Sequence, residues 1–434
     1  MKRSVIILGA LLLFTTVLSR SGAAQAALGD SVTSRPLVPG VTFRRIESAS
    51  GPWVLSVLEV DLRRPELDIR GVRACDMILG RERPSAIARR LRQEGLNVVG
   101  ALNADFFDLR GGTGAAVSSV VIDGELVKAV ADSPADRSDD ARTQFGTTTD
   151  RRPVIERFSL TGLVRAPSGD WPLAAVNARV QAGLALLTRW FDSTAVLAAA
   201  DSAVVSVSML KTGGRGDTAH YRVDTIPVRR GLDVPTEQTV VLVASGDAIP
   251  VVERLRPGDR VDVITKLSPD RGPLRTVIGG WPRIVRGGQN VALEADTVEG
   301  TRPGFSQARH PRSALGISRD SATLYLVTVD GRQERSVGMT LDELANAMIA
   351  LGAYEAMNFD GGGSTTLVVR DSVVNNPSDK SGERPVGNVI VVTRNGGKQP
   401  AEGRRAVPRR EKAVSSCVLP VRADTTSAGP RQTQ

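Results

Sequence analysis

Short runs in which apolar and polar residues alternate dominate the chain. The run at 54–62 has a period of two and is followed by Pro65, which is typical of a half-buried β-strand. Turn pairs such as Asp123-Gly124 and Asp330-Gly331 follow other runs. The pattern therefore predicts many strands, including runs at 204–210, 239–244, 260–267, 322–329, 365–369 and 388–393.

Helical patterns are few. One covers 85–94, and the clearest covers 340–351. Thr340 and Glu343 form a capping box for the second helix, its apolar residues make one stripe, and Gly352 ends it. We interpret this stripe as core packing. The whole pattern predicts an α+β fold: a mixed, β-rich single domain with few helices.

The two ends of the chain differ from its middle. A basic start, an apolar run from Val5 to Leu18 and an Ala-rich stretch predict a secretory signal peptide at 1–26, with an uncleaved anchor as the alternative. Residues 397–434 are rich in Arg, Pro, Ser and Thr and predict a disordered basic tail. The polar segment 130–152 predicts a solvated loop.

Charge is concentrated at these ends. The 434 residues carry a formal net charge of +9. The first 26 residues contribute +3 and those from Arg394 onward +6, so the middle of the chain is electrically balanced. Because the middle of the chain carries no net charge, a nucleic-acid-binding protein is not expected. A length of 434 residues with 41% apolar residues is enough for a sizeable core.

Scarce His and Cys residues narrow the chemistry further. Only His220 and His310 are present, with no Gly-x-Ser-x-Gly motif, which counts against a Ser-His-Asp hydrolase and a zinc framework. Cys75 and Cys417 could form one disulfide outside the cytosol or remain two thiols. The sequence leaves both open.

The most distinctive motif is Asn-Phe-Asp-Gly-Gly-Gly-Ser-Thr-Thr at 358–366. Consecutive glycines can bring main-chain N–H groups against a ligand with no side chain in the way. Together with the Ser364 and Thr365 hydroxyls, they predict a cradle for phosphate or sugar oxygens with Asp360 at its edge. A tight turn capped by Asp360 is the alternative.

Three other segments carry candidate polar groups. Asn103 and Asp105 follow an apolar run and could face one side of a pocket; the alternative is an Asx-turn with the next two Phe residues in the core. Arg312 precedes an apolar strand and could grip phosphate in bidentate fashion, or be an ordinary surface Arg. Residues 384–388 offer a kink at Pro385 and the Asn388 amide.

In this order, the four segments resemble the phosphodiester glycosidase family. The similarity extends to 118–124, to Gly-Gly-Trp-Pro at 279–282 and to 376–379, and covers roughly 50–395. The family often has Asn-Gly-Gly-Phe-Phe where this chain has Asn-Ala-Asp-Phe-Phe at 103–107, so a catalytic role for Asp105 stays open. The resemblance implies a catalytic domain of mixed type, which we place at 41–396.

The resemblance also implies an activity. We expect an exported hydrolase, periplasmic or extracellular, that cleaves the glycosidic bond of sugar-1-phosphodiesters, for example N-acetylglucosamine-1-phosphodiester, in extracellular or envelope glycans. A departing phosphate is already a stable anion, so one carboxylate plus donors to phosphate could suffice. The expected partners are that sugar-1-phosphodiester or glycan, with no cofactor, no metal, no nucleic acid and no stable membrane span after signal cleavage.

Residue roles follow as a hypothesis, with two alternatives to the activity. One alternative is a non-catalytic carbohydrate-binding envelope protein. The other is a metal-dependent phosphodiesterase in which Asp105, Asp108 and Asp360 hold Mg²⁺ or Ca²⁺. The expected roles are catalytic for Asp360 and Asp105; phosphate-binding for Arg312, Gly361, Gly362, Gly363, Ser364 and Thr365; and substrate-binding for Asn103, His310, Asn358 and Asn388.

Overall fold

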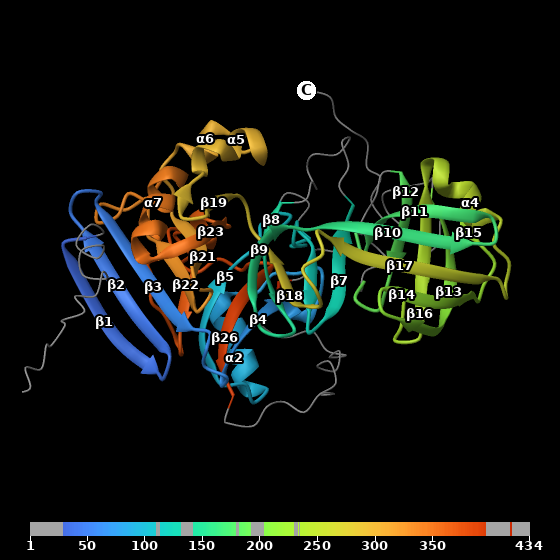
Figure 1. The fold of residues 1–434 in the computed structure, drawn as a ribbon, viewed down its shortest axis with the longest axis horizontal. Coiled ribbons are helices and arrows are strands. Elements are labelled where there is room, and N and C mark those ends of the chain that lie inside the picture. Colours follow the sequence, from blue (N-terminus) through green and yellow to red (C-terminus); the bar gives the residue numbers. More distant parts are fainter. Residues whose placement is uncertain are drawn as a thin grey trace, which may run out of the picture.

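Two antiparallel sheets, packed face to face, carry the predicted site (Figure 1). Sheet A has the order β1 (Ser31–Val38), β2 (Val41–Ser48), β3 (Trp53–Asp61), β22 (Thr323–Val329), β21 (Arg312–Ser318), β23 (Ala353–Phe359), β19 (Arg283–Arg286) and β20 (Gln289–Asn290). Sheet B has the order β25 (Ser372–Val373), β24 (Leu367–Val369), β5 (Val98–Asn103), β26 (Asn388–Arg394) and β4 (Leu67–Arg73).

This computed structural model describes residues 29–109, 113–131, 142–178, 182–191, 204–229, 233, 235–395 and 417–418. The predicted signal peptide, and the predicted tail except for residues 417–418, lie outside them. Strands predominate and helices are few, so the β-rich prediction is confirmed, whereas the α+β label is not. Within the described part of the chain, no helix combines the length and the apolar character needed to cross a membrane.

The main core lies between the two sheets. Leu58, Leu315 and Phe359 from sheet A meet Leu102 and Ile390 from sheet B, and all five are fully buried. The predicted runs at 54–62 and 388–393 form β3 and β26. Their apolar residues make them core strands, because burial of apolar surface is the main force holding the sheets together.

Helices cover the outer faces of both sheets. Helix α7 (Leu341–Leu351) packs on sheet A, and helix α2 (Pro84–Gln93) packs on sheet B. The predicted capping box of α7 is confirmed: the Glu343 N–H donates to Thr340 Oγ1 at 3.1 Å, and the Thr340 N–H donates to Glu343 Oε2 at 2.9 Å. The short helices are η1 (Ala74–Asp76), η2 (Gly246–Ala248), α4 (Ile249–Glu253), η3 (Ala292–Glu294), α5 (Ala295–Val298), α6 (Pro303–Ser306) and η4 (Gly362–Ser364).

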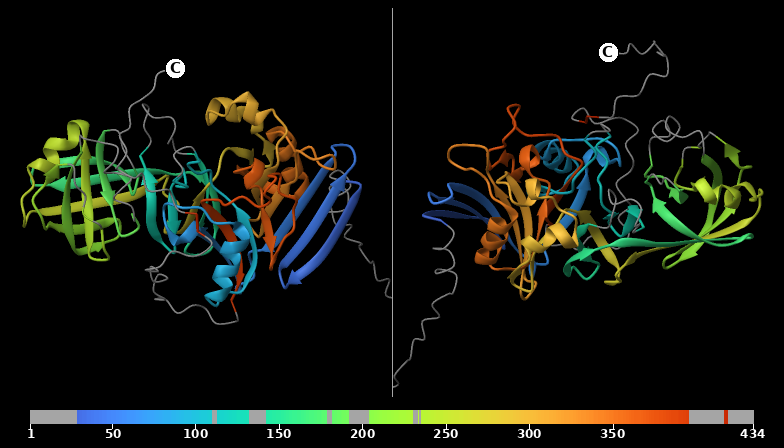
Figure 2. Two further views of the ribbon diagram at one scale, coloured as in Figure 1. Left: turned by 180° about the vertical axis from the view of Figure 1, so that it is seen from behind. Right: turned by 90° about the horizontal axis from the view of Figure 1, so that it is seen from above.

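A closed barrel of seven strands stands at one end of the molecule (Figures 1 and 2). It has its own apolar core, which includes Leu173, Val207 and Leu242. Its strands, in order, are β10 (Ser159–Ala166), β17 (Arg260–Ser268), β14 (Thr218–Val223), β13 (Val204–Arg215), β16 (Thr239–Ser245), β12 (Gly183–Leu187) and β11 (Gly169–Val176), and pairing of β11 with β10 closes it. Short β15 (Val228–Arg229) pairs with β13.

Five strands connect the barrel to the two sheets. They are β7 (Glu125–Val130), β6 (Val120–Ile122), β18 (Leu274–Gly279), β8 (Thr143–Thr148) and β9 (Pro153–Arg157). Strand β8 corrects the predicted loop at 130–152, whose part at 132–141 lies outside the described residues. Thr143, Gln144 and Thr148 of β8 are buried and make hydrogen bonds; Gln144 Nε2, for example, donates to the Phe158 carbonyl at 2.7 Å. A polar sequence therefore does not mean a solvent-exposed loop here.

The two cysteines form a disulfide. Cys75 and Cys417 are bonded with their Cα atoms 5.7 Å apart, although 342 positions separate them in sequence. Next to the bond, Val418 pairs with Arg81 through main-chain hydrogen bonds in both directions. The bond thus closes a loop that contains most of the described chain, with β1 to β4 outside it.

Replacing both cysteines by serine should lower the melting temperature. Cross-linking so long a loop restricts the unfolded chain, and disulfides typically stabilise a folded protein by about 2–4 kcal/mol. Calorimetry of Cys75→Ser/Cys417→Ser measures the loss, and the wild type in reductant should match the variant. Equal melting temperatures for oxidised wild type and variant would contradict a stabilising disulfide.

Candidate functional site

The ends of β5 and β23 place two predicted carboxylates next to each other. Asp105 follows β5, and Asp360 follows β23. The two ends are joined directly, since the Asp360 N–H donates to the Ala104 carbonyl at 2.8 Å and Asn103 Nδ2 donates to the Asp360 carbonyl at 2.6 Å. Asp105 and Asp360 also interact electrostatically. We call these two residues the carboxylate pair.

Asp360 is the more accessible member of the pair. It is partly exposed, whereas Asp105 is 1% exposed. Burial of its carboxyl group raises the pKa of Asp360 to about 6, and the charge of Asp105 raises it as well. A hydrogen bond from Ser364 and the charge of Arg384 act in the opposite direction. Its carboxyl group is thus poised to titrate close to neutral pH.

Asp105 is held from all sides. The Ser118 N–H and hydroxyl donate to its two carboxylate oxygens at 2.9 and 3.1 Å, and its own N–H donates to Asn388 Oδ1 at 2.9 Å. Burial raises the pKa of Asp105 to about 6, against these Ser118 bonds and the charges of nearby basic residues. Gly279 packs so closely that a Cβ there would overlap the carboxylate. This close approach explains the glycine in the 279–282 motif.

The glycine turn forms in a different way from the predicted cradle. Residues 362–364 make a 3₁₀ turn. The Gly362 N–H donates to the Pro311 carbonyl at 2.9 Å, and the Ser364 and Thr365 N–H groups donate back within the turn at 3.1 and 3.3 Å. The predicted nest of three glycine amides is therefore not formed. The Gly361 N–H instead bonds to Asp360, which lowers the pKa of that carboxyl group.

Arg384 is the cation beside Asp360. Its guanidinium donates to both carboxylate oxygens of Asp379 at 2.8 and 3.0 Å, and its Nη1 donates to Ser364 Oγ at 3.5 Å. A Cβ on Gly363 would overlap both Arg384 and Asp379, so this glycine makes room for the ion pair. The sequence of 384–388 indicated a kink and the Asn388 amide but gave no sign that Arg384 belongs to the site.

Arg312, which was predicted to grip phosphate, is bonded to main-chain carbonyls. The side chain is 1% exposed, and its N–H groups donate to the carbonyls of Met339, Phe305 and Ala308 at 2.6–3.0 Å. Burial lowers the pKa of Arg312 to about 10. Arg312 therefore holds the segment around α6 against sheet A.

The buried amides of Asn103 and Asn358, which were predicted to contact substrate, bond to neighbouring strands and turns. Asn103 Oδ1 accepts from the Ser313 hydroxyl at 2.7 Å and the Thr366 N–H at 3.0 Å. Asn358 Nδ2 donates to the carbonyls of Trp281 and Phe359. Besides Arg312, the polar residues predicted to contact the ligand that are at most 1% exposed are Asn103, Asn358, Asn388, Ser364 and Thr365.

His310 remains accessible, and a second cation accompanies it. Arg332 is exposed, and its Nη2 lies 3.5 Å from His310 Nδ1. The Arg332 guanidinium also lies against Gly362. Burial and the charges of Arg312 and Arg332 lower the pKa of His310, which favours its neutral form. Arg332, His310 and Arg384 thus border the glycine turn with groups that can meet an anion.

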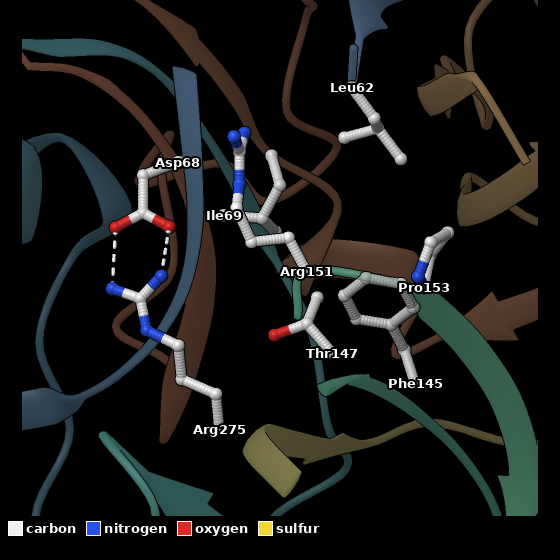
Figure 3. Close-up of a pocket in the computed structure, with 8 residues that line it drawn as sticks. All are labelled: Leu62, Asp68, Ile69, Phe145, Thr147, Arg151, Pro153 and Arg275. Carbon is white, nitrogen blue, oxygen red and sulfur yellow. Dashed lines mark hydrogen bonds and ion pairs between the residues drawn. The ribbon is translucent and has the colours of Figure 1, made fainter. Parts of the chain in front are cut away.

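Two cavities lie elsewhere. The cavity in Figure 3, beside the Asp68–Arg275 ion pair, has about 10 Å³, which is space for one water molecule. A larger one of about 520 Å³ is lined by residues that include Arg83, Glu383 and Val418. Neither is lined by the carboxylate pair.

The three-aspartate metal site is not assembled. Asp108 accepts a hydrogen bond from the Thr113 hydroxyl at 2.7 Å, within its own loop. Among the residues that the structure describes, no three His, Cys, Asp or Glu side chains gather as metal ligands.

Part of the chain that carries this site is similar to a known protein family. The profile of the family described as phosphodiester glycosidase matches residues 214–393. The predicted resemblance to the phosphodiester glycosidases is confirmed. The match includes Asp360 and Arg384, while Asp105 precedes it.

Two curated proteins are similar to this chain over short stretches. Mouse N-acetylglucosamine-1-phosphodiester alpha-N-acetylglucosaminidase is 30% identical over 114 residues, which are 25% of this chain and 22% of the mouse protein. The SPbeta prophage-derived protein YomE of Bacillus subtilis (strain 168) is 38% identical over 85 residues, 20% of this chain and 13% of YomE. The chain thus spans less than a quarter of the length of these relatives.

Solved structures share the fold more broadly. A Synechocystis protein superposes with a TM-score of 0.67 and 21% identity, covering 84% of this chain and 64% of that protein. A protein of Burkholderia pseudomallei K96243, named as a candidate exported protein, superposes with a TM-score of 0.61 and 22% identity, covering 80% of this chain and 75% of its own.

Opposite shifts in the pKa of Asp360 should follow from changing its two charged neighbours. Asp105→Asn removes a negative charge and should lower the pKa, whereas Arg384→Gln removes a positive charge and should raise it. Carboxyl ¹³C NMR titration measures both from a wild-type value of about 6. Shifts in one common direction would contradict the described electrostatics.

Gly363→Ala should destabilise the protein, because the added methyl group overlaps the Arg384–Asp379 ion pair. We expect a loss of about 1–3 kcal/mol on chemical denaturation, the usual effect of overpacking. Gly304→Ala is the matched control, since a Cβ there meets nothing within 4 Å. Equal stability of the two variants would show that residue 363 tolerates a side chain.

Proposed function

We propose that this protein hydrolyses sugar-1-phosphodiesters at the glycosidic bond. The family match supports a glycosidase-type hydrolase. The observation that carries the specific proposal is the carboxylate pair, in which an accessible Asp360 with a raised pKa lies beside the Arg384 cation. A carboxylate next to a cation suits a substrate that joins an anomeric carbon to a phosphate.

The reaction needs one bond broken and one formed. A water oxygen attacks the anomeric carbon, the bond from that carbon to the phosphate oxygen breaks, and the phosphate keeps the electron pair. The water proton passes to Asp360 acting as general base; alternatively, Asp360 attacks the carbon itself and water hydrolyses the ester. Either route yields free sugar and a phosphomonoester.

The residues around Asp360 have separate roles in the proposed reaction. Burial, with a contribution from the charge of Asp105, raises the pKa of Asp360, which makes Asp360 a stronger base while it is still ionised at pH 7. Arg332 is exposed, and its guanidinium can bind two phosphate oxygens at once. Arg384, whose Nε and Nη2 are bonded to Asp379, contributes its positive charge and its Nη1. Ser364 is buried and orients both Asp360 and Arg384.

We also propose that the protein acts outside the cytosol. The signal-like sequence at 1–26 supports export. The Cys75–Cys417 disulfide supports an oxidising compartment, since such bonds are rare in the cytosol. Envelope or extracellular glycans would then be within reach.

Asp360→Asn should reduce kcat by about 10²–10⁴-fold, the usual contribution of a general base. Asp371→Asn is the matched control, because the Asp371 side chain is 83% exposed and pairs only with Arg92 among the described ion pairs. NMR of the first product from a panel of sugar-1-phosphodiesters reports the bond cleaved and the stereochemistry.

Three outcomes would contradict the proposal. Near-normal turnover by Asp360→Asn would show that Asp360 is not the general base or nucleophile. Phosphate left on the sugar, with activity lost in EDTA, would favour the metal-dependent phosphodiesterase. Ligand-induced stabilisation without any product would favour the carbohydrate-binding protein.

A further inference from the structure

Three aromatic side chains form a partly exposed group beside the carboxylate pair. Phe106 directly follows Asp105, Trp281 follows the Gly279-Gly280 pair, and Phe305 lies on α6. The Phe106 ring meets Trp281 and Phe305 edge-on at centroid distances of 5.8 and 5.9 Å, and Trp281 stacks on Phe305 at 5.0 Å. We call these three residues the aromatic platform.

The platform is fixed to the strands that hold the carboxylates. The Trp281 main chain exchanges hydrogen bonds with Asn358, in β23, at 2.6 and 2.8 Å. Its indole Nε1 donates to the Glu299 carbonyl at 2.9 Å. Because Gly279 packs on Asp105, the chain that leads to Trp281 passes directly over that carboxylate.

Cations brace the platform. The Arg312 guanidinium lies 4.9 Å from the Phe305 ring centroid, and Arg142 lies 4.8 Å from that of Trp281. Cation–π contacts of this kind hold rings in place. The platform is therefore preorganised before any ligand arrives.

Three large aromatic rings that stay partly exposed keep apolar surface in water, which is unfavourable unless a ligand covers it. A pyranose has faces of C–H groups that pack on aromatic rings while its hydroxyls remain free to hydrogen-bond. We propose that the aromatic platform binds the pyranose ring of the substrate and thereby selects cyclic sugars over acyclic alcohols. This inference rests on the proposed function for the position of the scissile bond.

The two sides of the site then match the two halves of the substrate. Arg384 and Arg332 border the glycine turn after Asp360, and the platform borders Asp105. A sugar-1-phosphodiester would place its anion toward the arginines and its ring on the platform, with the anomeric carbon near Asp360.

Aromatic-to-leucine variants test the platform, because leucine keeps the site apolar while removing the flat face. Phe106→Leu and Phe305→Leu should each raise KM for a pyranosyl phosphodiester about 3–10-fold, the range expected for one aromatic contact. The kcat value should change less than twofold, and inhibition by inorganic phosphate should be unchanged. Trp171→Leu, in the barrel strand β11, is the matched control.

A second measurement separates this inference from the proposed function. Free N-acetylglucosamine and glucose, titrated into Asp360→Asn, should change tryptophan fluorescence saturably, and glycerol should not. Loss of that signal in Asp360→Asn/Trp281→Phe would support contact with Trp281. If the wild type binds sugar but turns over no substrate, the proposed function is refuted, whereas the proposed sugar binding by the aromatic platform still holds. If both leucine variants fold and turn over substrate with an unchanged KM, the proposal that the platform binds the pyranose ring is wrong.

Discussion

The hydrogen-bonded junction between the ends of β5 and β23 is the constraint on which the site depends. One strand belongs to sheet B and the other to sheet A, so no shared ladder fixes their relative position. Asn103 supplies that connection, donating to the Asp360 carbonyl and accepting from Ser313 and Thr366. With these three bonds made inside the protein, a buried amide sets the distance between two carboxylates that lie 255 positions apart.

Holding two carboxylates together has an electrostatic consequence. Burial raises the pKa of both acids, and the charge of Asp105 adds to the rise at Asp360. Ser118 stabilises the charged form of Asp105 from one side, and Ser364 with Arg384 stabilises that of Asp360 from the other. The surrounding donors thus limit the rise and leave the pair near the pH at which a general base works best.

The sequence predicted local features well because their causes are local. The capping box of α7 and the strands at 54–62 and 388–393 depend on neighbouring residues. Closure of the barrel by β10 and β11 depends on long-range pairing, and the burial of polar β8 depends on partners from distant segments such as Phe158. Neither barrel closure nor the burial of β8 produces a recognisable pattern among residues that are close together in sequence.

The same distinction explains the site. The Asp360 motif was visible as a run of unusual residues, but which cation faces it was not, because a buried Arg and an accessible Arg read alike in sequence. Arg312 has its N–H groups taken by carbonyls, and Arg384 is kept beside Asp360 by Asp379 and by the space at Gly363. Only the folded chain distinguishes the two.

Only part of the candidate site lies within the residues that match the family profile. Asp360, Arg384 and Trp281 lie within the matched residues 214–393, while Asp105 and Phe106 precede them. Since Asp105 raises the pKa of Asp360, the acidity of that carboxyl group depends in part on a residue outside the matched region. A relative with glycine at the position of Asp105 would lose that repulsion, and its equivalent of Asp360 would ionise at lower pH. The carboxylate pair therefore allows the pH range of the proposed reaction to vary while the reacting group stays the same.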